Sequence, residues 1–342
     1  MSRLWKLCLA LAMVAVAGLA QAQSEAQQQQ QRRLDQPGNN APVWREVRKE
    51  GSQENYTSIK GREANVLVQS AGNTWRQIRN GPVTFYGGWL VVIVTLALAA
   101  FYFVKGPLKL HEKPTGRMVA RFSLAERWAH WTMAISFCVL GVTGLITLFG
   151  KHVLLPVIGY TLFAWLSALA KNLHNFIAPL FIASLLVFIV MFVKDNVYQK
   201  GDIGWLIKAW RMFVKGEHVP SWRFNMGEKV YFWAGVVGLC LALSVTGLIL
   251  LFPNFDQVRS TMQLASIVHA VTAMLMIALA LGHIYVGTIG VEGAYRNMAD
   301  GVTDEVWAKE HHELWYNEVK RGAKPAPGGA VPAGAPHMKE KP

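Results

Sequence analysis

Five stretches of the chain contain no Asp, Glu, Lys or Arg, and each is at least twenty residues long. They cover residues 85–104, 128–149, 172–193, 230–252 and 264–291. About twenty apolar residues let a helix cross the hydrocarbon core of a bilayer, where a helix satisfies its own backbone hydrogen bonds. We therefore expect an all-α membrane protein, with a bundle of four transmembrane helices and one additional helix before it.

The composition agrees with this expectation. Of the 342 residues, 52% are hydrophobic and only 16% are charged, against roughly 25% charged in an average soluble domain. The formal net charge of +13 could suggest a nucleic-acid binder. However, the basic residues lie in the segments between the apolar runs, where they would face an anionic membrane surface. We expect a lipid bilayer and no nucleic acid as the partner of this charge.

The first 22 residues have the features of a secretory signal peptide. Arg3 and Lys6 precede the apolar run 7–19, and Ala20-Gln21-Ala22 offers a small-residue cleavage site. An uncleaved signal anchor is the alternative. Residues 23–84 are polar, and we expect them to form a partly disordered arm outside the bilayer.

The distribution of basic residues predicts the orientation. The segments 105–127, 194–229 and 292–342 hold six, seven and seven Lys and Arg, whereas 150–171 and 253–263 hold two and one. Positive charge marks the cytoplasmic side of a membrane protein. We expect a multi-pass protein of a bacterial inner membrane, with a periplasmic N-terminus after signal cleavage and a disordered cytoplasmic tail over residues 321–342.

The segment between the third and fourth apolar stretches contains a further helical pattern. Apolar residues recur at helical spacing from Ile203 to Val214, with Lys208, Arg211 and Lys215 among them. An amphipathic helix at the membrane surface fits this pattern, and so does an ordinary loop helix packed on the bundle.

Four of the ten histidines fall inside apolar stretches, where an unpaired ionisable group is costly and therefore suggests function. His269 and His283 lie 14 residues apart on the last stretch, which is ~21 Å along a helix and within roughly 40° of the same face. The predicted orientation puts His130 at the inner depth with His283, and His174 at the outer depth with His269.

Two imidazole pairs, each level across a helix bundle, are what two six-coordinate haems require. The three cysteines, Cys8, Cys138 and Cys240, form no CxxC motif, so the haems would be non-covalent and b-type. Zinc or copper would need more protein ligands at one depth. Four structural histidines remain the alternative.

An internal repeat lies at the depth of the outer pair. Residues 142–149 read VTGLITLF and residues 245–252 read VTGLILLF. Gly144 follows His130 by the same 14 residues that separate His269 from His283, so we expect Gly144 and Gly247 to let a porphyrin approach the backbone. Close packing of helices through small residues is the alternative explanation.

Several motifs together carry a family likeness. They are AERWAHW around His130, KNLHNF around His174, the loop run FNMGEKVYFW, SIVHA and LGHIY on the last stretch, and the tail WAKEHHELWY. In this order they resemble the gamma (cytochrome b556) subunit of membrane-bound respiratory formate dehydrogenase. The likeness covers about residues 117–320 and implies a di-haem cytochrome b domain there. The stretch 85–104 lies outside it and inherits no role from it.

The resemblance also implies a function. An extracytoplasmic molybdenum or tungsten subunit would oxidise formate, and an iron–sulfur subunit would pass electrons to this chain, which would reduce menaquinone or ubiquinone. The outer haem would be held by His174 and His269, and the inner haem by His130 and His283. The quinone would lie near His283 and Asn225, with Gly227 beside it.

Some details of the quinone site stay open at the sequence level. A related bacterial subunit has Gln at the position of Glu228, and either Glu228 or Lys229 could deliver protons. Asn225 taken alone is equally well explained as a helix N-cap.

Two other functional classes share parts of this pattern. The chain could be the cytochrome b subunit of a hydrogenase or of a thiosulfate or polysulfide reductase, or it could be a haem-free membrane anchor. The neighbouring His311 and His312 could suggest a metal site in the tail, but we expect them to be solvated on a helix rich in Lys and Glu.

Overall fold

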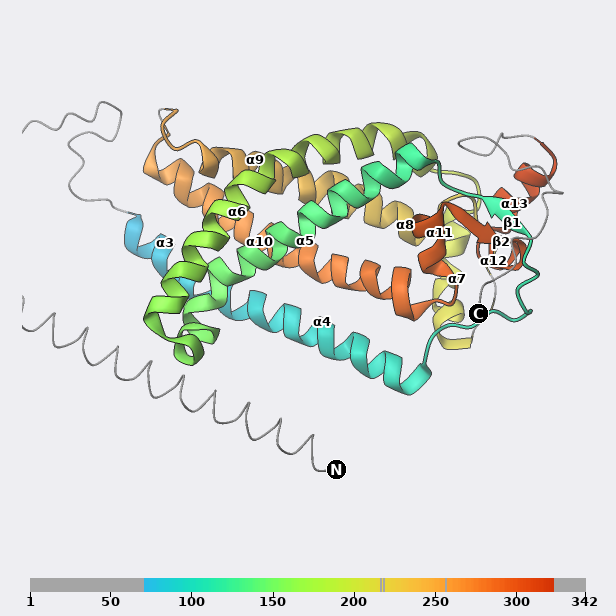
Figure 1. The fold of residues 1–342 in the computed structure, drawn as a ribbon, viewed down its shortest axis with the longest axis horizontal. Helices are drawn as coiled ribbons and strands as arrows, with labels where there is room; N and C mark the ends of the chain where they lie inside the picture. The colour runs from blue at the N-terminus through green and yellow to red at the C-terminus, as the bar shows by residue number, and fades with distance from the viewer. Residues whose placement is uncertain (1–70, 216, 218, 256, 323–342) are drawn as a thin grey trace, which may run out of the picture.

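The computed structural model describes residues 71–215, 217, 219–255 and 257–322. In this part of the chain five long helices form a bundle that is capped at one end by short helices and a small sheet (Figure 1). Each is long and apolar enough to cross a membrane, and their bounds are Gly72–Lys105, Leu124–Val153, Leu155–Asn196, Met226–Leu251 and Arg259–Gly290. The predicted stretches match these helices to within one residue at their ends or lie inside them, so the predicted all-α membrane fold is confirmed.

The first long helix begins earlier than the sequence suggested. It consists of α3 (Gly72–Ile78), a wide π-helical segment η1 (Arg79–Val83) and α4 (Thr84–Lys105). Residues 72–84, which we assigned to the polar arm, are therefore helical. Pro82 falls inside the π-helical segment, which accommodates a residue that cannot donate a backbone hydrogen bond. The predicted signal peptide, the arm before residue 71 and the tail beyond residue 322 lie outside the described residues.

α5 (Leu124–Val153) and α6 (Leu155–Phe192) form a tight antiparallel hairpin. α5 starts at a capping box, in which the Ser123 hydroxyl accepts from Glu126 N and the Glu126 carboxylate accepts from Ser123 N. The chain reverses at Gly159, whose φ of 76° suits only a residue without a Cβ. A Cβ on Gly150 would lie 2.7 Å from Phe163 Cε2, so the two helices approach closely at this end.

The other half of the bundle is a second pair of long helices. The first is continuous through α8 (Met226–Val230), η3 (Tyr231–Leu239) and α9 (Cys240–Leu251). The second runs through α10 (Arg259–Tyr285) into η4 (Val286–Gly290). An apolar core joins the two halves, and its buried members are Phe122, Phe181, Leu185, Phe192, Phe232, Val236, Cys240, Met276 and Ala280.

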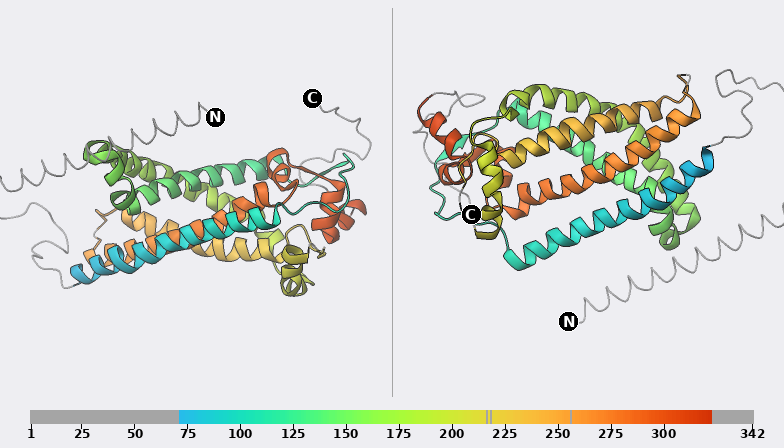
Figure 2. Two further views of the ribbon diagram at one scale, coloured as in Figure 1. Left: turned by 90° about the horizontal axis from the view of Figure 1, so that it is seen from below. Right: turned by 180° about the vertical axis from the view of Figure 1, so that it is seen from behind.

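α4 lies along α10 at the edge of this bundle, as both views in Figure 2 show. A Cβ on Gly87 would lie 2.7 Å from Met274 Cγ, and one on Gly88 would lie 3.2 Å from the Phe149 ring. The two glycines thus let α4 sit directly on α10 and reach α5. The opposite face of α4 is exposed and apolar, with Trp89 and Phe103 on it, as expected of a surface that contacts lipid.

The predicted amphipathic helix is α7 (Asp202–Lys215). Its Trp205 is buried at 6% exposure and joins it to the bundle. Five other apolar side chains are between 50% and 67% exposed, namely Ile203, Leu206, Ile207, Trp210 and Val214. The apolar face therefore points away from the bundle, which is the arrangement that a helix at a membrane surface requires.

The capping structure combines a segment that precedes α5 with segments that follow α10. β1 (Met118–Ala120) pairs antiparallel with β2 (Val302–Asp304), and the short helices α11 (Ala294–Asp300), α12 (Glu305–His311) and α13 (Glu313–Lys320) surround them. His312 is 2% exposed, and its Nδ1 lies 2.6 Å from the Trp222 carbonyl. The expectation of a solvated His312 is therefore wrong, because the α12–α13 turn folds back onto the loop before α8.

Two carboxylates of this cap hold the connection between α4 and β1. The Glu310 carboxylate accepts from the backbone N–H groups of His111 and Glu112 at 3.0 and 3.1 Å. The Asp304 carboxylate accepts from those of Thr115 and Gly116 at 3.3 and 2.7 Å. The linker to the additional helix is thus fixed to the last described part of the chain.

Candidate functional site

The four histidines of the apolar helices form two pairs, which meet α10 at positions 14 residues apart. The ring centroids of His130 on α5 and His283 on α10 are 6.3 Å apart, and the ring planes meet at 54°. Those of His174 on α6 and His269 on α10 are also 6.3 Å apart, at 71°. The structure therefore brings together the partners that the sequence pattern paired by depth.

The spacing within each pair fits two ligands on opposite sides of one metal ion. A metal–imidazole nitrogen bond is about 2.0 Å long, so two such rings have centroids roughly 6 Å apart. Among the described residues, no group of three or more His, Cys, Asp or Glu side chains is placed to hold a metal ion. Each pair therefore suits a metal that brings its remaining ligands with it, as the iron of a porphyrin does.

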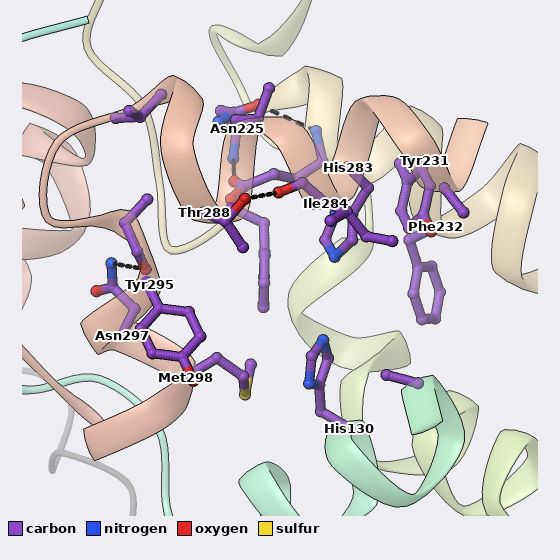
Figure 3. Close-up of a pocket in the computed structure, with 18 of the residues that line it drawn as sticks. His130, Asn225, Tyr231, Phe232, His283, Ile284, Thr288, Tyr295, Asn297 and Met298 are labelled. Atoms are coloured by element: carbon purple, nitrogen blue, oxygen red, sulfur yellow. Dashed lines mark hydrogen bonds between the residues drawn. The ribbon is translucent and has the colours of Figure 1, made fainter. Parts of the chain in front are cut away.

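A cavity of about 750 Å³ surrounds the first pair, and we call it the His283 cavity. In Figure 3 the rings of His130 and His283 face one another across it, with Tyr231 beside His283. The Tyr231 and His283 rings are stacked, with centroids 4.6 Å apart and planes 9° from parallel. Asn225 and Glu228 line the same cavity. Of the three residues that the resemblance associated with a quinone, it therefore contains His283 and Asn225, whereas Gly227 does not line it.

The residues around Asn225 form the start of α8. The Asn225 Oδ1 accepts from Glu228 N at 3.0 Å, and the Glu228 carboxylate accepts from Asn225 N at 2.7 Å. Asn225 is thus a helix N-cap that also faces the cavity. A Cβ on Gly227 would lie 3.1 Å from Trp205 Cη2, so Gly227 lets α7 pack against α8.

Lys229 does not line the cavity. Its side chain is 2% exposed and its ammonium group donates to Asp202 at 2.7 Å and to Gln199 at 3.1 Å. Of the two candidate proton donors, only Glu228 borders the His283 cavity. Lys229 instead fixes α7 to α8 through a buried ion pair.

A cavity of about 240 Å³ surrounds the second pair, and we call it the His269 cavity. Both glycines of the internal repeat line it. A Cβ on Gly144 would lie 3.6 Å from His174 Cε1, and one on Gly247 would lie 3.3 Å from His269 Cε1. Gly247 therefore permits a close approach of the His269 ring, whereas the distance at Gly144 is an ordinary van der Waals contact. Both glycines lie at the depth of this pair, as the sequence predicted.

The charged groups at both cavities include basic ones that sequence reasoning missed. Arg79 and Lys171 line the His269 cavity, and none of the side chains lining it is a carboxylate. Arg121 lines the His283 cavity at 2% exposure, and its Nε and Nη1 have no hydrogen-bond partner among the described residues. Burial lowers the pKa of Arg121 to about 10, so it stays cationic at neutral pH. These groups suit the anionic propionates of haem.

Comparison with known proteins agrees with this arrangement. The sequence model of the prokaryotic cytochrome b561 family matches residues 121–301. The cytochrome b556(fdo) subunit of formate dehydrogenase from Escherichia coli strain K12 is 31% identical over 206 residues, which are 59% of this chain and 94% of that protein. The nitrate-inducible cytochrome b556(Fdn) subunit of the same strain is 28% identical over 215 residues, 60% of this chain and 93% of that protein. The formate dehydrogenase cytochrome b556 subunit of Haemophilus influenzae is 26% identical over 210 residues, 58% and 83% of the two chains.

Proposed function

Because the chain belongs to the prokaryotic cytochrome b561 family, we propose that it is the di-haem b electron-transfer subunit of a formate:quinone oxidoreductase. The membrane cytochrome b character follows from the family and from the five apolar helices. The haem number, the quinone and the direction of transfer are the parts that we propose. The haem number is supported chiefly by two imidazole pairs with the same 6.3 Å spacing at two positions along α10.

His174 and His269 would bind one haem, and His130 and His283 the other. Each haem b, when bound, supplies a carrier that accepts and releases one electron within the hydrocarbon region. Around His174 and His269, Gly144 and Gly247 line the cavity, and Arg79 and Lys171 offer cations to the propionates. Around His130 and His283, the Arg121 nitrogens that have no hydrogen-bond partner among the described residues offer the same.

The difference in size between the cavities supports a quinone at the His283 end. The His283 cavity, at about 750 Å³, is roughly three times as large as the other, at about 240 Å³, and thus has more room for a second ligand. Asn225 could donate its amide N–H to a quinone carbonyl while its Oδ1 caps α8. Glu228 could supply protons, because its carboxyl group borders the cavity.

The basic loops put the His283 end on the cytoplasmic side in this proposal. Partner subunits outside the cytoplasm would oxidise formate at a molybdenum or tungsten centre and relay electrons through iron–sulfur clusters. Electrons would enter beside His174 and His269 and leave beside His283, where protons come from the cytoplasm. Moving one charge across the membrane stores ~2.3 kcal/mol per 100 mV of potential, so the subunit would help to conserve formate's reducing energy.

The complex purified from its native membrane tests this proposal. We expect two b haems per chain in a reduced-minus-oxidised spectrum, and both should be reduced by formate and reoxidised by added quinone. Absence of haem would support the membrane-anchor alternative. A co-purified hydrogenase or sulfur-compound reductase, with no formate oxidation, would support the other cytochrome b alternative.

A further inference from the structure

The repeated V-T-G sequence places a threonine beside each histidine of one pair. Thr143 Oγ1 lies 2.9 Å from His174 Nδ1, and Thr246 Oγ1 lies 3.0 Å from His269 Nδ1. Both threonines are buried, at 4% and 8% exposure. The same position of two similar eight-residue segments, on α5 and on α9, thus makes the same contact with the following long helix.

The direction of these hydrogen bonds follows from the remaining contacts of the hydroxyl groups. Thr143 Oγ1 lies 2.8 Å from the Val139 carbonyl, and Thr246 Oγ1 lies 2.6 Å from the Ala242 carbonyl. A carbonyl can only accept, and a hydroxyl has one hydrogen to donate. Each threonine therefore donates to its own helix and accepts from the imidazole Nδ1–H.

This direction fixes the tautomer of both rings. When the proton is on Nδ1, the lone pair is on Nε2, which is then free to bind a metal. The glycine after each threonine lies against the same ring. A Cβ on Gly247 would lie 3.3 Å from His269 Cε1, which is a close approach, and one on Gly144 would lie 3.6 Å from His174 Cε1, which is an ordinary contact. Each threonine therefore holds one ring by a hydrogen bond, and the neighbouring glycine contacts that ring.

The other histidine pair lacks this arrangement. His130 Nδ1 is buried and has no hydrogen-bond partner among the described residues. The His283 ring is stacked on Tyr231, which is a contact with the face of the ring. The two pairs therefore have equal spacing but different surroundings.

We propose that Thr143 and Thr246 are positioning residues that lower the midpoint potential of the haem bound by His174 and His269. A hydrogen bond accepted from Nδ1–H fixes the ring and makes the ligand more basic, and a more basic ligand stabilises the oxidised iron. The two haems would then have the same type of axial ligand, and their midpoint potentials would differ because only one histidine pair is hydrogen-bonded to threonines. This inference rests on the proposed function, since it assumes that the pair binds haem.

Redox titration of the purified complex, followed by optical spectra, tests the proposal. The variants Thr143→Val and Thr246→Val keep the shape of the side chain and remove the hydroxyl, whereas Thr143→Ser and Thr246→Ser keep the hydroxyl. Thr95→Val is the matched control, because Thr95 Oγ1 donates to the Val91 carbonyl on α4 and contacts no histidine.

We expect each valine variant to raise the midpoint potential of one haem component, the double variant to raise it further, and the serine variants and Thr95→Val to match the wild type. Loss of that haem in the double valine variant, with recovery in the double serine variant, would also support the proposal. Unchanged potentials in a double valine variant that holds both haems would overturn it, as would equal loss in the valine and serine variants. A wild-type complex without haem would instead refute the proposed function.

Discussion

The rings of Phe137 on α5 and Phe181 on α6 form a wall between the two cavities. Their centroids are 6.1 Å apart at an interplanar angle of 44°, and both side chains line the His283 cavity and the His269 cavity. Phe181 is 5% exposed and belongs to the apolar core that joins the two halves of the bundle. The two cavities therefore share an aromatic boundary.

Removal of the Phe181 ring should weaken the bundle. We expect Phe181→Ala to lower the free energy of unfolding by about 3–5 kcal/mol, because a buried ring is lost and the cavity left behind cannot collapse fully. Phe176→Ala on the same helix is the control, since Phe176 is 80% exposed and its ring has few protein neighbours. Denaturant titration in detergent measures the free energy of unfolding of both variants. Similar losses in the two variants would contradict the role of Phe181 in the bundle core.

Two substitutions at Asn225 separate its roles as helix cap and as quinone ligand. Serine is a good N-cap and has no amide, whereas alanine removes the cap at a cost of about 1 kcal/mol. We expect Asn225→Ser to keep the stability of the wild type and still to lose most quinone reduction, while formate reduces both haems. Wild-type turnover in the serine variant would mean that Asn225 serves only to start α8.

Arg79 should matter to haem retention although it lies outside the region that matches the family. We expect Arg79→Gln to lose haem from the His174–His269 pair more readily during purification, because one of the two cations lining that cavity is removed. Arg76→Gln is a matched control one turn earlier, where the guanidinium contacts Asn73 at 3.0 Å and does not line the cavity. Haem content per chain gives the result, and equal content in both variants would argue against a role for Arg79.

The hydrogen bonds from His111 and Glu112 to the Glu310 carboxylate predict that the stability of the linker between α4 and β1 depends on pH. Burial alone would raise the pKa of Glu310, but hydrogen bonds from the backbone of His111 and Glu112 and from the His111 ring outweigh it and hold that pKa below 4.5. A carboxylate with a lowered folded-state pKa stabilises the fold above its ordinary pKa, and this stabilisation is lost as the pH falls through the lowered value.

Amide hydrogen exchange of the linker measures this effect. Protection of His111 and Glu112, corrected for intrinsic rates, should decrease below about pH 4.5, and Glu310→Gln should show reduced protection already at neutral pH. The amide of Leu108 is the internal control, because it donates to the Gly290 carbonyl at 2.9 Å. A uniform decrease in protection that includes Leu108 would indicate general unfolding and not loss of the hydrogen bonds to Glu310.

The spans and the histidine pairs were predictable because both depend on local properties of the chain. Absence of charge over about twenty residues defines a span, and fourteen helical steps fix the axial distance between His269 and His283. Contacts between distant segments were not predictable in this way. Burial of His312 depends on Trp222, 90 residues earlier, and nothing in the polar sequence around Arg79 indicates that it borders a cavity.

The hydroxyl contacts of Thr143 and Thr246 in the repeat were predictable only in part. The sequence showed two V-T-G segments, and their glycines predicted the correct depth. The threonines gave no separate signal, because a threonine within an apolar helix commonly bonds to its own backbone, as Thr95 does. Only the position of α6 against α5, and of α10 against α9, shows which threonines also meet an imidazole.

The cap over the His283 cavity also has a consequence for biosynthesis. Trp307, Glu310, His311 and His312 line this cavity, yet they leave the ribosome after all five long helices. The His283 cavity therefore lacks this part of its lining until residues 307–312 have been made, and during that time a prosthetic group could enter from this side. The His269 cavity, whose lining is complete once α10 has been made, has no such late-arriving cover.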